Sequence, residues 1–407
     1  MFNKDYRSIK DCKITGTLFP SVPVFVIISK KKRHIADNQK GEPNMKKLFA
    51  LLLAAVMMLG MMSFASADGM RVAMITDYGD ITDQSFNQTT YEAAKAFCEA
   101  NGIDFQYYKP ASDSDDDRIS SIEKAIDDGF TVIIMPGYAF GPAIQKVAPE
   151  YDDITFIALD VSEGDIGDLA SAVPANLYCA VYQEELCGYM AGYAAVKLGY
   201  KKLGYLGGMA VPAVVRYGYG FVQGADAAAA ELGAADVEIK YVYGNQFYGD
   251  ADITAYMDTW FAAGTEIVFA CGGGIFTSAG EAAAKVGGKV IGVDVDQKGT
   301  IDGLYGDGIT VTSAMKGLAA TVNAQLSAVK DGAFAGGKVE NLGLVSAVPE
   351  ENFVQIAPST QFADGFTAED YAALVAKMFA GEITVSNAID AEPAVTAVTV
   401  DYQGNIK

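Results

Sequence analysis

Short apolar runs alternate with alanine-rich stretches of helical period along most of the chain. Nine runs rich in β-branched and aromatic residues predict strands, at residues 71–76, 104–108, 131–136, 154–160, 202–208, 237–244, 266–272, 289–296 and 309–314. These runs are apolar almost throughout, which is typical of strands covered on both faces. In the first stretch between them, Phe86, Thr90, Ala93, Ala94 and Phe97 fall on one helical face. The pattern predicts an α/β protein with parallel sheets flanked by helices.

The number of strands predicts two lobes rather than one. Residues 176–200 interrupt the rhythm with a strand that runs into a long helix, so we place a lobe boundary near residue 177. Residues 339–357 are strand-rich without a helix between, which suits a chain returning between lobes, and a helix is predicted at 367–380. The predicted N-terminal lobe holds residues 68–176 plus about 317–345, and the C-terminal lobe holds 177–316 plus about 346–407.

The first 67 residues differ from the rest. Residues 45–67, "MKKLFALLLAAVMMLGMMSFASA", have a basic start, an apolar stretch and an Ala-x-Ala ending, and predict a secretory signal peptide. An uncleaved membrane anchor is the alternative. Residues 1–44 form a polar leader that an export signal does not normally tolerate, so we interpret them as translated upstream DNA, with a real N-terminal extension as the alternative. No cysteine stands directly after the signal, which continues as Asp68-Gly69-Met70, so a lipid anchor is not supported, and the predicted location is periplasmic or outside the cell membrane.

Charge and composition narrow the function. Residues 1–67 hold 11 Lys and Arg against 4 Asp and Glu, so the remainder carries 19 against 47, a net charge of −28. Such acidity argues against nucleic acid as a partner. The single histidine, His34, lies in the leader, so the exported chain has no histidine for a catalytic triad or a zinc site. We therefore predict no metal, no cofactor and no catalytic residue.

Four cysteines follow the predicted signal, and their spacing matches no metal motif. Apolar neighbours favour buried thiols for Cys98, Cys179, Cys187 and Cys271. A disulfide between Cys179 and Cys187 is the alternative for an exported protein.

Polar and aromatic residues gather in loops at the ends of the predicted strands. The stretch "DYGDITDQSFNQTTYE" at 77–92 leads from the first strand into a helix, and Ser85 and Gln88 have the spacing of a capping box. In open α/β sheets ligands bind at this carboxyl edge. The candidate ligand-binding residues are Asp77, Phe86, Asn87, Asp160, Phe247, Gly273, Asp294 and Lys316.

Aspartates and aromatic rings at a cleft edge suit a sugar or a nucleoside. Carboxylates accept hydrogen bonds from paired hydroxyls, and rings stack on a flat base. Taken alone, Asp77 is as readily a turn cap, Phe86 a core residue and Lys316 a solvated side chain. Arg216 and Tyr217 could face the cleft or solvent, and the pattern does not decide.

Two further motifs have plainer explanations. The glycine run "CGGGIFTSAG" at 271–280 lacks the Gly-Lys-Ser/Thr of a phosphate loop, so its glycines are expected to let a ligand approach the backbone. The acidic run "SDSDDD" at 112–117 lacks the glycine and closing glutamate of a calcium loop, and predicts a solvated helix N-terminus.

Residues 70–380 resemble the basic membrane protein family, which includes purine-nucleoside-binding proteins of ABC transporters. The matching motifs are "DQSFNQTTYEAA", "GGMAVPAVVRYGYGFVQGA", "CGGG" and "VIGVDVDQ". The resemblance implies a type I periplasmic-binding-protein fold, two doubly wound Rossmann-like lobes that close on a nucleoside in the cleft between them. It implies ligand contacts at Asp77, Phe86, Asp160 and Asp294. The opposing stacking ring maps onto Phe247, with Phe276 and Tyr217 as rivals.

The resemblance predicts a monomeric solute-binding protein that delivers a nucleoside, with a purine base, to an ABC permease at the membrane. Riboflavin or a sugar as the ligand is a second hypothesis. A third is an exported nucleoside or glycan hydrolase that uses Asp77 with Asp83, or Asp294 with Asp296, as acid and base. A sensor that presents its ligand to a receptor would share all these features.

Overall fold

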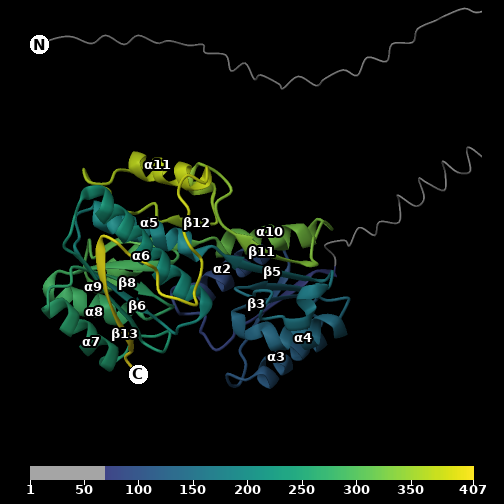
Figure 1. Cartoon of the computed structure of the whole chain (residues 1–407). Coiled ribbons are helices and arrows are strands. Elements are labelled where there is room, and N and C mark those ends of the chain that lie inside the picture. The colour runs from purple at the N-terminus through teal and green to yellow at the C-terminus, as the bar shows by residue number, and fades with distance from the viewer. Residues whose placement is uncertain (1–68) are drawn as a thin grey trace, which may run out of the picture. The chain divides into compact units, whose positions relative to one another are not determined.

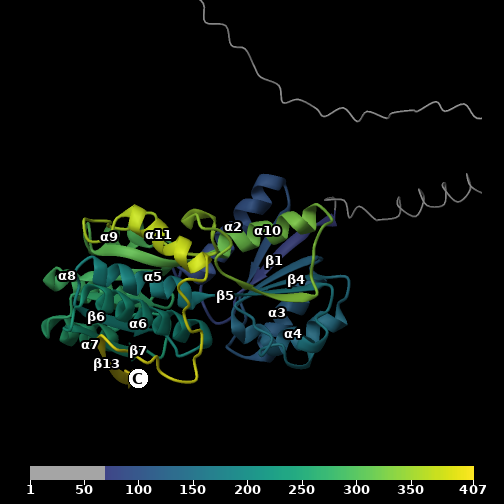
Figure 2. The same ribbon diagram turned by 45° about the horizontal axis from the view of Figure 1, so that its top comes forward.

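Within residues 69–407, which the computed structural model describes, two predominantly parallel sheets carry the fold (Figures 1 and 2). The leader and signal peptide predicted at 1–44 and 45–67 lie outside the described residues. The first sheet has the strand order β11-β5-β4-β3-β1-β2, and the second β12-β10-β9-β8-β6-β7-β13. Among these strands only β12 runs antiparallel to its neighbour, β10.

The first lobe is built on the six-stranded sheet. Its elements are β1 (Arg71–Ile75), α2 (Phe86–Asn101), β2 (Asp104–Tyr108), α3 (Asp115–Asp127), β3 (Val132–Pro136), η2 (Tyr138–Phe140), α4 (Gly141–Glu150), β4 (Thr155–Leu159), η3 (Gly167–Ser171), β5 (Leu177–Tyr182), α10 (Leu318–Lys330) and β11 (Lys338–Leu342).

The second lobe is built on the seven-stranded sheet. Its elements are α5 (Glu184–Lys197), β6 (Lys202–Gly207), α6 (Pro212–Leu232), β7 (Val237–Tyr243), α7 (Ala251–Ala262), β8 (Ile267–Cys271), α8 (Phe276–Val286), β9 (Lys289–Asp294), α9 (Lys298–Tyr305), β10 (Thr310–Lys316), η4 (Pro349–Glu351), β12 (Val354–Ile356), α11 (Ala368–Phe379) and β13 (Val398–Asn405).

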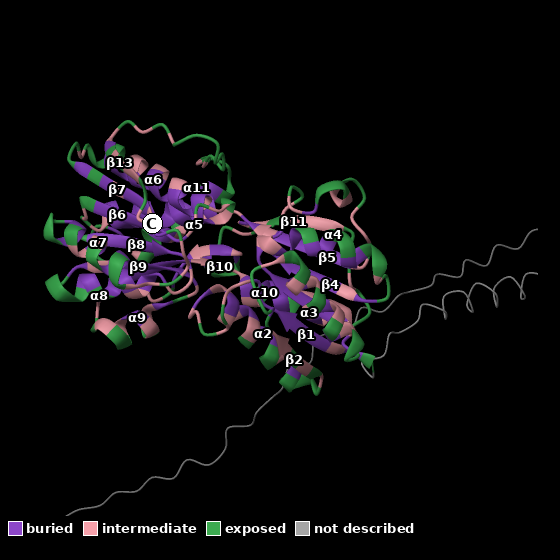
Figure 3. Ribbon diagram, turned by 90° about the horizontal axis from the view of Figure 1, so that it is seen from below, coloured by how far each residue is buried: buried purple, intermediate pink, exposed green. Residues whose placement is uncertain are grey.

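Both faces of each sheet are covered, as the unbroken apolar runs predict. On β1, Val72 and Met74 pack in the same core as α2, whereas Ala73 and Ile75 pack on the opposite face with α3 and α4. Alternate residues of a strand point to opposite faces, so a strand buried on both sides must be apolar at every position. Figure 3 shows this burial as purple strands between helices whose outer faces are green.

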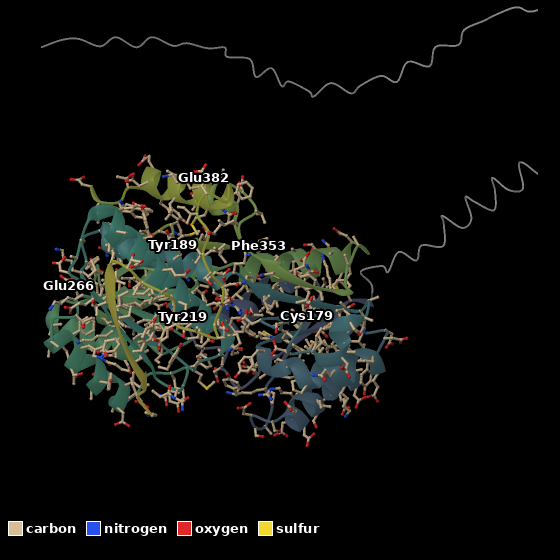
Figure 4. All side chains as sticks on the ribbon, viewed as in Figure 1. Cys179, Tyr189, Tyr219, Glu266, Phe353 and Glu382 are labelled. Atoms are coloured by element: carbon tan, nitrogen blue, oxygen red, sulfur yellow. The ribbon has the colours of Figure 1, made fainter. Side chains whose placement is uncertain are left out.

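The lobe boundary predicted near residue 177 is wrong by one strand. β5 pairs with β4 through Phe156 and Leu177 and with β11 through Tyr178 and Lys338, so it belongs to the first sheet. The chain crosses to the second lobe between Tyr182 and Glu184. Figure 4 places Cys179 of β5 in the first lobe and Tyr189 of α5 in the second. The sequence pattern identifies the strand but not its pairing partner, which tertiary structure decides.

Two further crossovers follow β10 and β11. Lys316 ends β10 in the second sheet, and after Gly317 helix α10 packs against α2 in the first lobe. After β11 the chain returns to the second sheet as β12, past Phe353 (Figure 4). The chain thus crosses between the two lobes three times.

The four cysteines among the described residues are buried free thiols. The alternative disulfide between Cys179 and Cys187 is therefore absent from this part of the chain. None of the helices in residues 69–407 combines the length and the apolar character that a membrane crossing requires.

Candidate functional site

A cavity of about 650 Å³ lies between the carboxyl ends of the two sheets. Its walls come from loops after β1, β3 and β4 of the first lobe, and from loops after β6, β7 and β8 and the end of β9 in the second. The structure brings all eight candidate residues to this cavity: Asp77, Phe86, Asn87, Asp160, Phe247, Gly273, Asp294 and Lys316. Their role in ligand binding stays a prediction.

Asp77 lies just after the first strand, β1, and is buried in a close cradle. Its Oδ1 accepts a hydrogen bond from the Gly79 N–H at 2.7 Å. A Cβ at Gly79 or at Gly137 would collide with neighbouring side chains, Asn87 at the first position and Asp77 at the second. Burial raises the pKa of Asp77 from 3.8 to about 6, although the backbone N–H groups of Gly79 and Tyr78 oppose the shift. The carboxylate is therefore an acceptor at neutral pH and becomes a donor in mild acid.

The capping box predicted for Ser85 and Gln88 is wrong. Asp83 caps α2 instead, because its Oδ1 accepts the N–H of Ser85 at 2.9 Å and of Gln88 at 3.0 Å, and its Oδ2 accepts the N–H of Asn87 at 2.9 Å. A carboxylate is the stronger acceptor for these groups. The hydroxyl of Ser85 is left free to donate to Asp294 Oδ2 across the cleft, at 2.6 Å.

Further bonds join the lobes beside Ser85. The Gln297 side chain donates to the backbone oxygen of Gln84 at 3.0 Å, and the Thr300 hydroxyl donates to the Gln84 side chain at 3.2 Å. Gln84 has a positive φ of 56°, which turns the loop toward the second lobe. The start of α2 is thus fastened to the loop after β9.

A buried group of charges lies where the chain crosses between the lobes. Lys316 Nζ is 2.6 Å from Asp160 Oδ2, 3.5 Å from Glu184 Oε1 and 3.7 Å from Asp294 Oδ1. Arg216 Nε donates to Glu184 Oε2 at 2.7 Å. We call these five residues the hinge charge cluster. When all five residues are ionised, the hinge charge cluster has a net charge of −1, because three carboxylates face two cations.

Burial and mutual attraction compete within the hinge charge cluster. Burial lowers the pKa of Lys316, but the carboxylates of Asp160, Asp294 and Glu184 outweigh it and hold the pKa above its usual range. Burial raises the pKa of both Glu184 and Asp294 despite their cationic neighbours. The lysine therefore remains a cation, and an additional donor near these carboxylates would be favourable.

Asp160 and Asp294 share an uncommon backbone conformation. Their φ values are +58° and +65°, in a region that costs a non-glycine residue of the order of 1–3 kcal/mol and is found most often at functional sites. Asp160 directly follows β4 of the first lobe, and Asp294 is the last residue of β9 of the second lobe. The turn directs both carboxylates to the cavity.

Two buried acceptors in the cavity wall have no hydrogen-bond partner among the described residues. They are Asp160 Oδ1 and Asn87 Oδ1. A buried acceptor without a donor costs about 1–3 kcal/mol, so each oxygen favours a molecule that brings a hydroxyl or an N–H.

Aromatic rings line the rest of the cavity. Phe86 is half-buried, with Lys316 Nζ 4.8 Å from its ring centroid. The Tyr78 and Phe247 rings, one from each lobe, are nearly parallel at 19° with centroids 6.1 Å apart. The rival rings are more enclosed: Phe276 is buried, and Tyr217 is buried with its hydroxyl donating to Asp294 Oδ1 at 3.2 Å.

The glycine run after β8 makes room for the Phe247 loop. A Cβ at Gly272 would lie 2.9 Å from the Phe247 ring, and one at Gly273 would lie 2.9 Å from the Phe247 backbone oxygen. This contact within the protein explains the glycines, which the sequence analysis assigned to ligand approach. Gly273 also lines the cavity.

Glu184 is not among the residues predicted from the sequence, and the sequence pattern does not decide the position of Arg216. Both belong to the hinge charge cluster, and Arg216 lines the cavity. A signal was available, because Glu184 and Glu185 open a helix in which every residue from Glu184 to Val196 except Leu186 is buried. Two acids at the start of such an apolar helix require a buried partner.

Other acidic groups have structural roles. Among residues 69–407, no cluster of His, Cys, Asp and Glu side chains could hold a metal ion. In the acidic run at 112–117, Ser114 caps α3 by accepting the N–H of Asp117, and Arg118 pairs with Asp113 and Asp115.

Comparison with known proteins identifies the family. A family model described as ABC transporter substrate-binding protein, PnrA-like, matches residues 70–362. The ABC transporter nucleoside-binding protein BmpA of Lactococcus lactis subsp. cremoris is 25% identical over 322 residues, which are 73% of this chain and 88% of that protein. Basic membrane protein A of Borreliella burgdorferi is 27% identical over 312 residues, covering 74% of this chain and 86% of that protein.

A solved structure carries the same fold. The ABC transporter solute-binding protein of Conexibacter woesei superposes with a TM-score of 0.61 at 23% identity, over 78% of this chain and 99% of that chain. The likeness confirms the predicted type I periplasmic-binding-protein fold, and the family model confirms the predicted resemblance. The chain belongs to the Bmp family of PnrA-like ABC transporter substrate-binding proteins.

Proposed function

We propose that the cavity captures a purine nucleoside, which the protein presents to an ABC permease outside the cytoplasmic membrane. The observation that carries this proposal is the pairing of buried, partnerless acceptors with aromatic rings in one cavity. Asp160 Oδ1 and Asn87 Oδ1 lack donors among the described residues, and Phe86, Tyr78 and Phe247 supply apolar faces beside them. A nucleoside offers ribose hydroxyl donors and a flat base in one molecule.

The rings are spaced to accept a flat base after a small movement. Tyr78 and Phe247 face each other from opposite lobes with centroids 6.1 Å apart. A base stacked between two rings needs about 7 Å, twice an ordinary contact between carbon atoms. Slight opening of the lobes would provide it, and Phe86 would pack against the ribose or the base edge beneath Lys316.

Closure of the lobes supports capture rather than catalysis. Ser85 bonds to Asp294, and Gln84 bonds to Gln297, so the two walls already meet at one side of the cavity. Hinge closure of this kind sequesters a ligand and creates the closed form that a permease can distinguish from the open one. The substrate-binding proteins of ABC importers act outside the cytoplasm, and we place this protein there as a monomer.

The acid–base pairs required by a hydrolase are engaged elsewhere. Both oxygens of Asp83 accept N–H groups at the start of α2. Asp296 Oδ1 accepts the Ser359 hydroxyl at 2.6 Å, and Asp296 does not line the cavity. Asp83 is therefore not free to act with Asp77 on one bond, and Asp296 is not free to act with Asp294. This argues for binding without chemistry.

Thermal unfolding with a ligand panel tests the proposal, because a ligand that binds only the folded state raises the midpoint with concentration. Inosine, guanosine or adenosine should raise it, and Phe86→Ala should abolish that rise. Phe97→Ala is the matched control, since Phe97 lies on the same helix but not in the cavity. Phe97→Ala should lower the unfolding midpoint of the unliganded protein, but the nucleoside should still raise that midpoint. If only riboflavin or a sugar raised the midpoint, the family assignment would be unaffected, but the proposal of a nucleoside ligand would be rejected.

A further inference from the structure

The last strand of the chain lies beyond the part that the family model matches. That part ends at residue 362, whereas β13 spans Val398–Asn405. Figure 1 shows this yellow segment running from α11 to the edge of the second sheet. On the way, Asp226 of α6 accepts the backbone N–H groups of Thr396, Ala397 and Val398 on one carboxylate oxygen, at 2.6–3.1 Å. The segment is therefore fastened before the strand begins.

β13 is attached to β7 and to α7 along its length. It pairs in parallel with β7 from Val398 opposite Val237 to Asn405 opposite Tyr243. The Gln403 side chain accepts hydrogen bonds from the Tyr256 hydroxyl at 2.8 Å and from the Trp260 indole at 3.1 Å. Both donors lie on α7, so the strand bridges the two elements that flank one loop.

The residues after β13 hold both ends of that loop, residues 244–249. The Ile406 N–H donates to the backbone oxygen of Tyr243, the last residue of β7, at 2.8 Å. Lys407 pairs with Asp250, which caps α7 through the N–H groups of Asp252 and Ile253 at 3.0 Å. Two adjacent residues thus contact the point where the loop starts and the point where it ends, in addition to the backbone bonds that Gly244 and Asn245 donate to Gly207 and Gly208.

This loop carries Phe247. Asp250 also accepts the Gln246 side chain at 2.9 Å, so the residue that Lys407 holds contacts the neighbour of Phe247 directly. From these contacts we propose that residues 405–407 are positioning residues for ligand binding, which hold the loop so that the Phe247 ring faces Tyr78. The proposal rests on the proposed function for the ligand, but the order of the loop can be measured without one. A ring fixed before binding does not have to be ordered by the ligand, which strengthens affinity.

Hydrogen exchange of the unliganded protein tests the positioning directly. A variant that ends at Gly404 should exchange the amides of residues 245–249 about 10-fold faster or more, since local opening governs exchange. Lys407→Ala, which leaves all strand pairing in place, should show a smaller increase in the same amides. The amides of β3, in the other lobe, should not change. Unchanged exchange in the loop of both variants would overturn the proposal.

The fluorescence of Trp260 shows whether the whole strand remains attached. It is the single tryptophan of the chain, and it contacts Gln403. An unchanged emission spectrum in the shortened variant means that β13 is still docked. If the spectrum shifts, Lys407→Ala alone decides, because that change removes only the ion pairs to Asp250 and Asp252.

Inosine binding tests the link to Phe247 through a double-mutant cycle. Shortening the chain to Gly404 should weaken inosine binding by roughly 5- to 20-fold when Phe247 is present, and not further in a Phe247→Ala background. Equal weakening in both backgrounds would contradict a role through Phe247. If the unaltered protein binds none of inosine, guanosine and adenosine, the proposed function fails, and the exchange experiment still decides whether residues 405–407 order the loop. If it binds guanosine or adenosine but not inosine, the same cycle is run with that nucleoside.

Discussion

Lys316 Nζ lies 2.6 Å from Asp160 Oδ2, and this ion pair joins the two lobes. Lys316 ends β10 of the second sheet, and Asp160 follows β4 of the first. The side chains are 3% and 15% exposed, so water screens the pair weakly. Because Glu184 and Asp294 also face Nζ, the lysine balances carboxylates from both lobes and from the crossover between them.

Lys316→Met should destabilise the unliganded protein by about 3–5 kcal/mol, the usual effect of removing one partner of a buried ion pair. The loss follows because Asp160, Glu184 and Asp294 would remain buried with Arg216 as the one cation of the cluster. Urea unfolding measures it.

Lys201→Met is the matched control for that prediction. Lys201 pairs with Asp236 at the surface, with both side chains more than half exposed. Its loss should cost less than about 1 kcal/mol. Similar losses in the two variants would mean that the hinge charge cluster is not important for stability.

Asp77→Asn should alter stability in a pH-dependent way. Burial raises the pKa of Asp77 from 3.8 in an unperturbed chain to about 6 in the folded protein. Between those values the folded state binds more protons than the unfolded state, so stability falls as pH rises through this window. This difference between the unfolded and folded pKa corresponds to roughly 3 kcal/mol.

The variant removes that penalty, so it should be more stable than the unaltered protein at pH 8, by up to about 3 kcal/mol, and equal to it near pH 4. The difference between the two unfolding free energies isolates Asp77 from other titrating groups, such as Glu185, whose pKa burial raises to about 7. A difference that stays constant from pH 4 to pH 8 would contradict the assignment. Inosine binding should weaken in the same variant at pH 8, where a carboxylate acceptor is lost.

Asp83→Ala should cost more stability than Ser85→Ala, although the sequence pattern assigns the cap to serine. Asp83 accepts three N–H groups at the start of α2, and loss of a cap costs typically 0.5–2 kcal/mol, about 1 on average. Ser85 makes no capping bond, and its partner Asp294 can be hydrated if the lobes part. Urea unfolding of the two variants measures the contribution of each residue, and a loss below about 0.5 kcal/mol in Asp83→Ala would contradict its capping role.

Most of the strands were predictable because burial on both faces leaves an apolar signal in the chain itself, whereas the edge strand β2 is exposed or half-buried and was predicted from its aromatic residues. Each of the nine predicted runs coincides with a strand, residues 176–200 contain β5 and α5, and residues 339–357 contain β12 and all of β11 except Lys338. The order in which the strands pair leaves no such signal in the sequence. The sequence of β5 suits either sheet, and only its contacts with β4 and β11 place it in the first.

The candidate site was predictable where strand ends bring loops together, and not where a residue acts through a distant partner. Asp77, Asp160 and Asp294 could be located because each follows or ends an apolar run. Glu184 depends on Arg216, 32 positions away, and Ser85 on Asp294, 209 positions away. β13 was missed because its alternating residues, "VTVDYQGN", give a weak signal after a long loop.

Gly192→Ala should destabilise the second lobe, because α5 and α6 cross with their backbones in contact. A Cβ at Gly192 would collide with the Phe221 backbone oxygen, and one at Gly224 would collide with that of Tyr189. Neither obstacle can rotate away, so overpacking should cost about 1–3 kcal/mol.

Gly303→Ala is the control for that prediction, since Gly303 also lies within a helix, α9, but has open space around its Cβ direction. There alanine should stabilise the helix by roughly 0.5–1 kcal/mol. Opposite signs for two chemically identical substitutions, measured by thermal unfolding, would identify close helix contact as the reason for glycine at position 192. If both variants gained stability, α5 and α6 would have to lie further apart than this structure places them.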